Sequence, residues 1–290
     1  MTALLATARA IHFASLMAIF GGSAYAALLR RAGLEGAPPK GARALFLTAA
    51  TLAIVSGMVW FALIAGQMSG SWQGSLDPAI LQLAAFDTRF GQIFLGRFIG
   101  LGVLCFMCAI GTRSRDLGAA ALAGLLLASL GPISHAAASG GNIAIVGAAS
   151  DAAHLLTGGF WLGGLMVLAM FSRRHWAHPA SLLGALRLFS IWGSAVVSLL
   201  VVTGMINAIS ILPVSEMSLR NPYFDLLLVK VGLASVMIGL AALNRWHFAP
   251  ALRTGGERAM RHLAASVGSE IVLGFTIVAI VGFLGLMAPH

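Results

Sequence analysis

Apolar residues run through this chain in long uninterrupted stretches, separated by short polar or basic segments. Each stretch approaches the ~20 residues that an α-helix needs to cross the hydrocarbon core of a bilayer. The pattern shows none of the alternation that is typical of β-barrel strands. It therefore predicts an all-α membrane protein with eight transmembrane helices, in which residues 1–290 form a single integral membrane domain. The predicted spans are residues 10–29, 45–66, 91–111, 117–136, 152–171, 185–211, 226–243 and 265–287.

Composition supports a membrane location. Hydrophobic residues make up 59% of the chain and charged residues 9%, whereas soluble domains carry roughly 25% charged residues. The net charge of +9 does not indicate a nucleic-acid partner, because 13 of the 18 Lys and Arg residues fall in alternate loops. Basic loops stay in the cytoplasm, so both termini are expected on the outer side of the membrane, with lipid around the helices.

The order of features in the first four spans recurs in the last four. The first span of each half contains a histidine near its start, a Gly-Gly pair and a closing Arg-Arg pair. Because four is an even number, both halves have the same orientation, and we predict two parallel four-helix repeats, residues 9–136 and 151–290. The matching positions are His12 and His154, Ser56-Gly57-Met58 and Thr203-Gly204-Met205, Arg97 and Lys230, and His135 and His290.

Histidines at the ends of spans are the main candidates for chemistry. An ionisable residue within a membrane span is a functional hypothesis by default. Imidazole suits copper, zinc, iron and nickel, and a thioether selects Cu(I). A single methionine is more often a packing residue, but several of these groups on one face indicate a shared metal site within about two turns of the outer surface. Its predicted ligands are His12, His135, His154, Met58, Met205 and His290.

Other polar residues within the spans suggest further roles. Arg97 and Lys230 are expected to form structural ion pairs with Asp87 and Asp225. Two thiols, in Cys105-Phe-Met-Cys108, share one helix face because residues three apart are neighbours. They could form a soft Cu(I) site, or they could simply be small buried residues. The sequence contains no phosphate loop, nucleophile elbow or paired carboxylates on one helix face, so we do not expect an enzyme.

The sequence resembles the CopD/PcoD family of copper-resistance inner-membrane proteins over essentially its whole length. One departure is Ser134-His135, where the family pattern has Gly-His. The residues that carry the resemblance are Arg9-x-x-His12 with Gly21-Gly22, Ser134-His135-Ala136, Asp151-x-x-His154, Gly159-Phe-Trp161-Leu-Gly163-Gly164-Leu165, Phe189-Ser190, Thr203-Gly204, Lys230 and Asn244-Arg245. The resemblance implies copper handling at the bacterial inner membrane, with a small periplasmic copper carrier of the CopC type as partner. At that membrane the outer side is the periplasm, so the basic loops predict that both termini are periplasmic.

These observations predict a membrane protein that binds copper, as Cu(I) or Cu(II), at its periplasmic face and moves it across the membrane. One alternative is a haem-binding membrane redox protein that uses the same histidines as axial ligands. Another is a docking partner of a periplasmic copper carrier that transports nothing. A Soret absorption band would indicate haem, and copper flux into liposomes would separate transport from docking.

Overall fold

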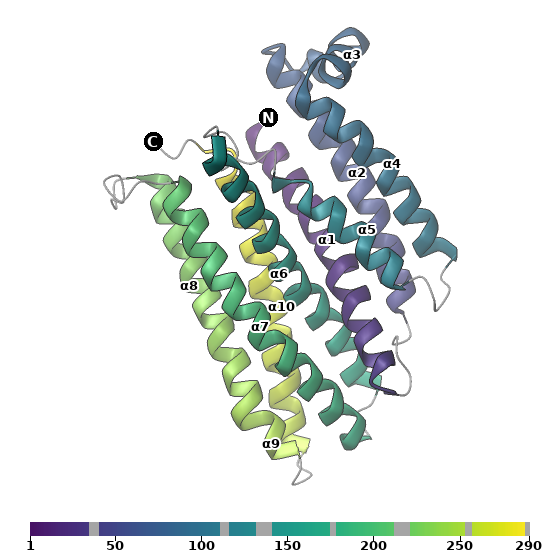
Figure 1. Cartoon of the computed structure of the whole chain (residues 1–290), viewed down its shortest axis with the longest axis vertical. Coiled ribbons are helices and arrows are strands. Elements are labelled where there is room, and N and C mark those ends of the chain that lie inside the picture. Colours follow the sequence, from purple (N-terminus) through teal and green to yellow (C-terminus); the bar gives the residue numbers. More distant parts are fainter. Residues whose placement is uncertain are drawn as a thin grey trace.

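The computed structural model describes residues 1–34, 41–110, 116–131, 141–174, 178–211, 221–252 and 257–287. Every regular element within these ranges is a helix, which confirms the predicted all-α class. The long helices are roughly aligned and form an elongated bundle (Figure 1). In chain order the α-helices of the described residues are α1 (Thr2–Arg31), α2 (Ala42–Met68), α3 (Pro78–Asp87), α4 (Arg89–Ile110), α5 (Asp116–Ala128), α6 (Gly141–Arg174), α7 (Pro179–Ile211), α8 (Pro222–Leu243), α9 (Ala249–Ala251) and α10 (Glu257–Leu284).

Among the described residues, seven helices are long and apolar enough to cross a membrane. These are α1, α2, α4, α6, α7, the run Pro222–Ala251 that contains α8, and α10. The predicted fourth span, residues 117–136, corresponds to α5, which has only 13 residues. At 1.5 Å per residue α5 is about 20 Å long, shorter than the ~30 Å hydrocarbon core. Residues 132–140, which include His135, lie outside the described residues, so the eight-span count is not established.

Two boundaries and one loop differ from the expectation. Helix α1 begins at Thr2 and α6 begins at Gly141, so both start about ten residues earlier than the predicted spans. The long segment between α2 and α4 is not a plain loop, because it contains α3 and a short 3-10 helix, η1 (Gln73–Ser75). Asp77 caps α3 by accepting a hydrogen bond from the Ala79 amide, with Pro78 in the first turn. Such an Asp-Pro start is a recognised helix signal.

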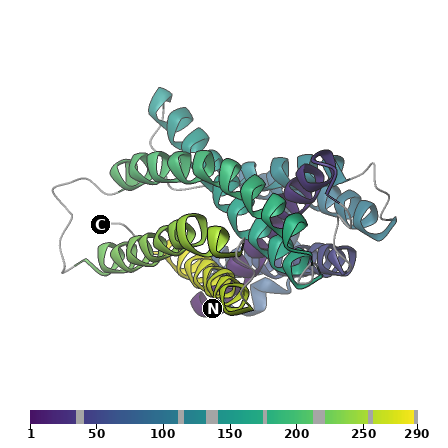
Figure 2. The same ribbon diagram turned by 90° about the horizontal axis from the view of Figure 1, so that it is seen from below.

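Helix α1 lies at the centre of the bundle. It packs against α2, α5, α6 and α10, and Figures 1 and 2 show it between the N-terminal and C-terminal groups of helices. At its crossing with α6, a Cβ atom on Gly163 would lie 2.6 Å from the Gly22 amide nitrogen, and one on Gly21 would lie 2.8 Å from the Phe160 Cα. Small residues allow such close backbone approach between membrane helices, so Gly21, Gly22 and Gly163 serve the packing of α1 against α6.

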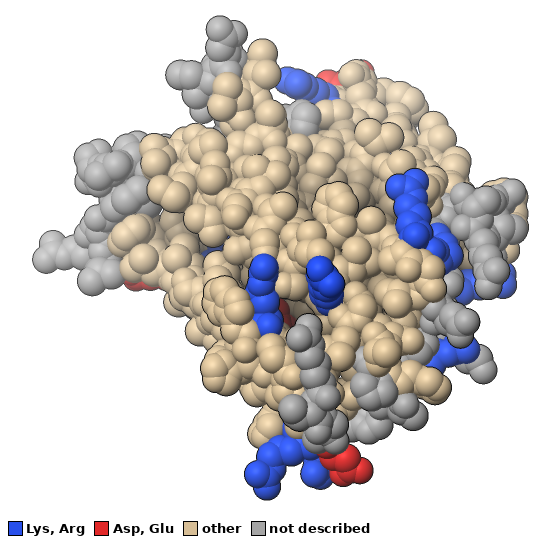
Figure 3. All heavy atoms as spheres, turned by 60° about the horizontal axis from the view of Figure 1, so that its bottom comes forward, with Lys and Arg blue, Asp and Glu red and all other residues tan. Residues whose placement is uncertain are grey.

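The two ends of the bundle differ in charge. At one end, which we call the terminal end, the start of α1 meets the end of α10, and Arg9 Nη1 donates a 2.7 Å hydrogen bond to the Gly285 carbonyl. At the opposite end, the basic end, blue Lys and Arg side chains are spread over the surface and red acidic ones are few (Figure 3). Its arginines at helix ends include Arg30, Arg31, Arg43, Arg173, Arg174, Arg245, Arg258 and Arg261. This asymmetry is typical of a cytoplasmic side.

Candidate metal site

His12 of α1 is completely buried, and the ring contacts fix its tautomer. Its Nδ1 lies 2.9 Å from the Ala53 carbonyl oxygen of α2. A carbonyl oxygen can only accept, so Nδ1 carries the hydrogen and donates. Nε2 therefore holds the lone pair, and it accepts a 2.6 Å hydrogen bond from Arg97 Nη2 of α4. The imidazole is thus neutral, with its single lone pair directed at a guanidinium.

Aromatic rings and a glycine enclose the His12 imidazole. The ring of Trp60 meets it edge-on with centroids 5.7 Å apart, and Phe94 stacks against it at 6.5 Å. A Cβ on Gly57 of α2 would lie 3.3 Å from two atoms of the His12 ring. The glycine therefore allows α2 to approach the imidazole, which accounts for Gly57 in the first copy of the recurring Ser/Thr-Gly-Met pattern.

Arg97 is buried and obtains its other partners at the end of α5 rather than from an acidic residue. Besides His12, its guanidinium donates to the Leu126 carbonyl and the Ser129 hydroxyl. The expected ion pair with Asp87 is therefore wrong. The reason is the early end of α5 at Ala128, since the last carbonyls of a helix lack intrahelical partners and are available to other donors.

His154 of α6 has a similar arrangement. Its Nδ1 lies 3.0 Å from Thr203 Oγ1 of α7. The Thr203 hydroxyl gives its own hydrogen to the Leu199 carbonyl at 2.7 Å, so it accepts from Nδ1–H and the lone pair again resides on Nε2. A Cβ on Gly204 would lie 3.2 Å from His154 Cε1. Gly204 thus allows α7 to approach the His154 ring closely, as Gly57 allows α2 to approach the His12 ring.

Lys230 of α8 supplies the positive charge beside His154. The ammonium acts electrostatically on the imidazole and also on the carboxylate of Asp151, one turn before His154 on α6. Asp151, rather than the expected Asp225, is therefore the acidic residue with which Lys230 interacts. Each described histidine of the predicted site thus combines an Nδ1–H bond to the next helix, a glycine against the ring and a basic residue of a third helix.

The two rings belong to different helix groups. His12 contacts α2 and α4, and His154 contacts α7 and α8. His12 lies ten residues after Thr2 and His154 thirteen after Gly141, which is about 15 and 20 Å from the starts of their helices. The helices begin earlier than the apolar pattern indicated, and the depth of the two rings below the membrane surface stays a prediction.

The remaining predicted ligands are not brought to these rings. Met58 and Met205 are 58% and 61% exposed, so their thioethers lie on outward helix surfaces. His135 and His290 lie outside the described residues. Within the described ranges, no group of three or more His, Cys, Asp or Glu side chains is placed to hold a metal ion. A six-ligand site shared between the two halves therefore stays a prediction, as does a site at Cys105 and Cys108, which form no disulfide.

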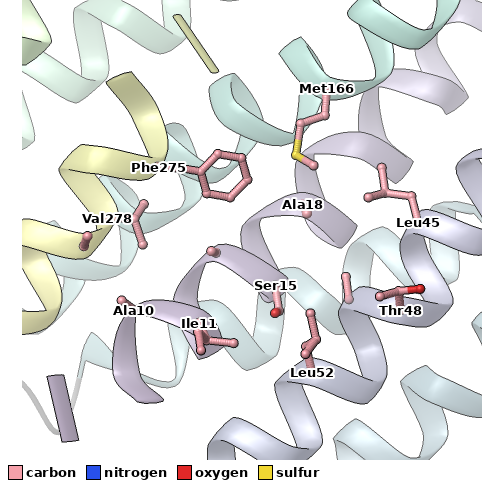
Figure 4. A pocket seen from close by; sticks show the side chains of 13 residues that line it. Ala10, Ile11, Ser15, Ala18, Leu45, Thr48, Leu52, Met166, Phe275 and Val278 are labelled. Atoms are coloured by element: carbon pink, nitrogen blue, oxygen red, sulfur yellow. The ribbon is translucent and has the colours of Figure 1, made fainter. Parts of the chain in front are cut away.

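A separate cavity of about 360 Å³ lies between α1, α2, α6 and α10. Its lining is apolar apart from the hydroxyls of Ser15 and Thr48, and the Met166 and Phe275 side chains point into it (Figure 4). None of its lining residues is an imidazole, cysteine or carboxylate. The cavity therefore adds no nitrogen or oxygen ligand of the kind expected around a metal ion and is distinct from the two histidines.

Comparison with known proteins places the chain among copper-related membrane proteins. The model of the copper resistance protein D-like N-terminal domain matches residues 1–145, and that of copper resistance protein D matches residues 183–284. Inner membrane protein YebZ of Escherichia coli K12 is 27% identical over 97% of both chains. Copper resistance protein D of Pseudomonas syringae pv. tomato is 27% identical over 86% of this chain and 84% of its own.

A third relative, copper transport protein CutJ of Bacillus subtilis 168, is also 27% identical, over 66% of this chain and 37% of its own. No solved structure matches the chain. The predicted resemblance is therefore confirmed by comparisons that cover both halves of the sequence.

Proposed function

Because this chain belongs to the copper resistance protein D family, we propose that it binds copper within the bacterial inner membrane and moves it across. Its relatives include proteins named for copper resistance and copper transport. In this proposal copper is the cargo, taken up at the terminal end, which faces the periplasm. The basic end faces the cytoplasm, in keeping with the distribution of arginines.

One observation carries the proposal: the shared tautomer of His12 and His154. Metal-binding histidines almost always donate the non-ligating ring N–H to a carboxylate, backbone carbonyl or water, which fixes the ring and directs the other nitrogen at the metal. His12 donates from Nδ1 to Ala53 and His154 donates from Nδ1 to Thr203. Both imidazoles therefore keep Nε2 as the nitrogen that can bind copper.

Arg97 and Lys230 give these sites a resting state without metal. Arg97 occupies the Nε2 lone pair of His12, so copper can bind only when the guanidinium moves aside. It has alternative acceptors in Leu126 and Ser129, which can hold it during copper binding. A positive charge beside each ligand weakens copper binding and so favours release, as a transporter requires.

We further propose that the two halves are parallel repeats, each with its own histidine site. The paired contacts of Gly57 with His12 and of Gly204 with His154 support this arrangement. Met58, Met205, His135 and His290 remain proposed additional ligands along the route. A periplasmic copper carrier of the CopC type remains the proposed donor. The haem alternative gains no support from the described residues, because the two rings lie in separate helix groups.

Copper content of the purified protein tests the proposal. Wild-type protein, H12A, H154A and the double variant would be loaded with Cu(I), freed of excess metal and analysed for bound copper. Each single variant should lose about half of the copper, and the double variant nearly all of it. H247A is the matched control, because His247 is an exposed histidine of the basic end. Normal copper content in the double variant would exclude these sites.

Flux into liposomes then separates transport from docking. Proteoliposomes with wild-type protein should accumulate copper in their lumen, and the double histidine variant should not. If the wild-type protein binds copper through His12 and His154 but no flux is measured, the protein is a docking partner rather than a transporter.

A further inference from the structure

Glu270 of α10 is a buried carboxyl that the copper sites do not use. It is only 1% exposed and lies within one of the candidate membrane spans. Trp161 of α6 donates its ring N–H to Oε2 at 3.3 Å, and Asn244 donates its side-chain amide to Oε1 at 2.6 Å. Residues from three separate elements therefore converge on one carboxyl.

No cation neutralises this carboxyl among the described residues. Arg245 is exposed and donates instead to Ser190 and Ser194 of α7, and His262 stacks on Phe248. Lys230 is fourteen residues before Asn244 on the same helix, about 21 Å away along the axis. Titratable and charged groups occur on the elements packed against α10, but among the described residues only Trp161 and Asn244 form hydrogen bonds with the Glu270 carboxyl. These groups are Arg9, His12, Tyr25, Arg30 and Arg31 of α1, Asp151, His154, Arg173 and Arg174 of α6, Tyr223, Asp225 and Lys230 of α8, Arg245 and His247 of the turn after α8, and Glu257, Arg258, Arg261 and His262 of α10 itself.

Asn244 carries an unused acceptor at this site. Its Oδ1 is buried and has no hydrogen-bond partner, while its Nδ2 faces the carboxylate. If Glu270 takes up a proton, rotation of the amide by half a turn lets Oδ1 accept the new O–H. Asn244 also begins a π-helical turn, Asn244–Phe248, a distortion that is frequent at functional sites. The same neighbours can therefore stabilise both protonation states of Glu270.

Apolar side chains separate Glu270 from the terminal end. One turn nearer that end, a Cβ on Gly274 would lie 2.8 Å from Leu162 Cδ1 and 3.7 Å from Met237 Cε. Leu162 and Met237 are both buried. On the other side, Arg245, Trp246 and His247, which follow Asn244 in the π-helical turn, are exposed at the basic end. Protons are therefore expected to reach Glu270 from the basic end.

We propose that Glu270 is a proton-binding site that exchanges protons with the basic end of the protein. A buried carboxylate without a cation is costly, and proton uptake removes its charge. The reaction is a simple transfer, in which the carboxylate accepts a proton from water and forms a carboxylic acid with no change in redox state. Copper is not the ligand, because the carboxylate oxygens already face two N–H donors and no further metal-binding side chain joins them among the described residues.

If the proposed copper transport is correct, protonation of Glu270 makes copper transport depend on protons. This claim about coupling rests on the proposed function. Proton binding itself does not depend on copper. The two claims can therefore be tested separately, the first in protein without copper and the second by flux.

Infrared difference spectroscopy of the whole protein in lipid, between acid and alkaline pH, tests the proton site. The chain has only nine Asp and Glu residues, so a single carboxylic acid C=O band can be assigned. Wild-type protein and the control E257Q, which changes an exposed glutamate of the same helix, should share this band. In E270Q it should be absent. A band unchanged in E270Q, or no carboxylic acid band in the wild type, would overturn the proposal.

If E270Q does not fold, W161F and N244A answer the same question. Each removes one donor to the carboxyl, so each should shift the Glu270 band, and an unshifted band in both would count against the site. Sidedness follows from proteoliposomes sorted by orientation. A pH step applied at the basic end should change the band quickly, and an equal response from the terminal end would contradict the proposed direction.

Copper flux of E270Q then tests the coupling. We expect flux that no longer responds to a proton gradient, with copper content at His12 and His154 unchanged. If the band is lost in E270Q but flux keeps its wild-type response, the proton site stands and the coupling is wrong.

Discussion

Replacing Arg97 with glutamine should raise the affinity of His12 for copper. Arg97 Nη2 lies 2.6 Å from His12 Nε2, so an ion bound to Nε2 would displace the guanidinium. At a separation of about 5 Å and an effective dielectric constant near 20, the remaining repulsion between two unit charges is about 3 kcal/mol. A loss of that repulsion corresponds to roughly a hundredfold in affinity. R97Q should therefore bind Cu(I) more tightly yet release it more slowly, so that flux falls.

Competition with a chromophoric Cu(I) chelator measures the affinity, and flux is followed in proteoliposomes. R261Q is the matched control, because Arg261 is exposed at the basic end and pairs only loosely with Glu257 at 3.9 Å. K230Q should have the corresponding effect at His154. Equal or weaker copper binding in R97Q, in protein whose thermal stability is retained, would refute the view that Arg97 opposes copper at His12.

Two further predictions follow from single contacts, and a third concerns the orientation of the protein. G163A places a methyl group 2.6 Å from the Gly22 amide nitrogen and should lower the free energy of unfolding by about 1–3 kcal/mol, which a lower melting temperature would show. In the control G193A the new methyl group has open space, so its stability should be unchanged or slightly higher. T203V leaves His154 Nδ1–H without its acceptor, at a cost of about 1–3 kcal/mol, and should reduce copper bound at His154, while T203S should retain it. A reporter fused after residue 290 should be active in the periplasm, and a cytoplasmic signal would reverse the proposed orientation.

Periodicity and composition were sufficient to predict the all-α class and most of the spans, because membrane helices need long apolar runs. Helix starts were harder to predict. The segments before residues 10 and 152 contain polar residues such as Thr7 and Asp151, yet they are helical. The reason is that such side chains find partners without ending the helix: Thr7 donates to the Ala3 carbonyl of its own helix, and Asp151 lies near Lys230 of α8. The Asp77-Pro78 pair predicts the start of α3, but hydropathy, which detects only long apolar runs, does not detect it.

The candidate site was predictable in its parts but not in its pairings. The sequence showed His12, His154, Arg97 and Lys230 as polar residues within apolar runs. It could not show that Arg97 reaches His12, because the other partners of Arg97 are a backbone carbonyl of α5 and the serine that follows this helix, and these carry no distinctive pattern. The contact of Trp161 and Asn244 with Glu270 was missed for a similar reason, since the three residues are far apart in sequence and helix periodicity does not tell which faces meet.

The glycine contact between α1 and α6 has a consequence for the passage of ions. Where the two backbones touch there is no room for a hydrated ion between them, so this crossing is closed to leakage. The apolar cavity beside it, between α1, α2, α6 and α10, offers an ion no imidazole or carboxylate ligand. An ion that passes through the protein would therefore have to follow a route lined by other side chains, such as those around His12 or His154.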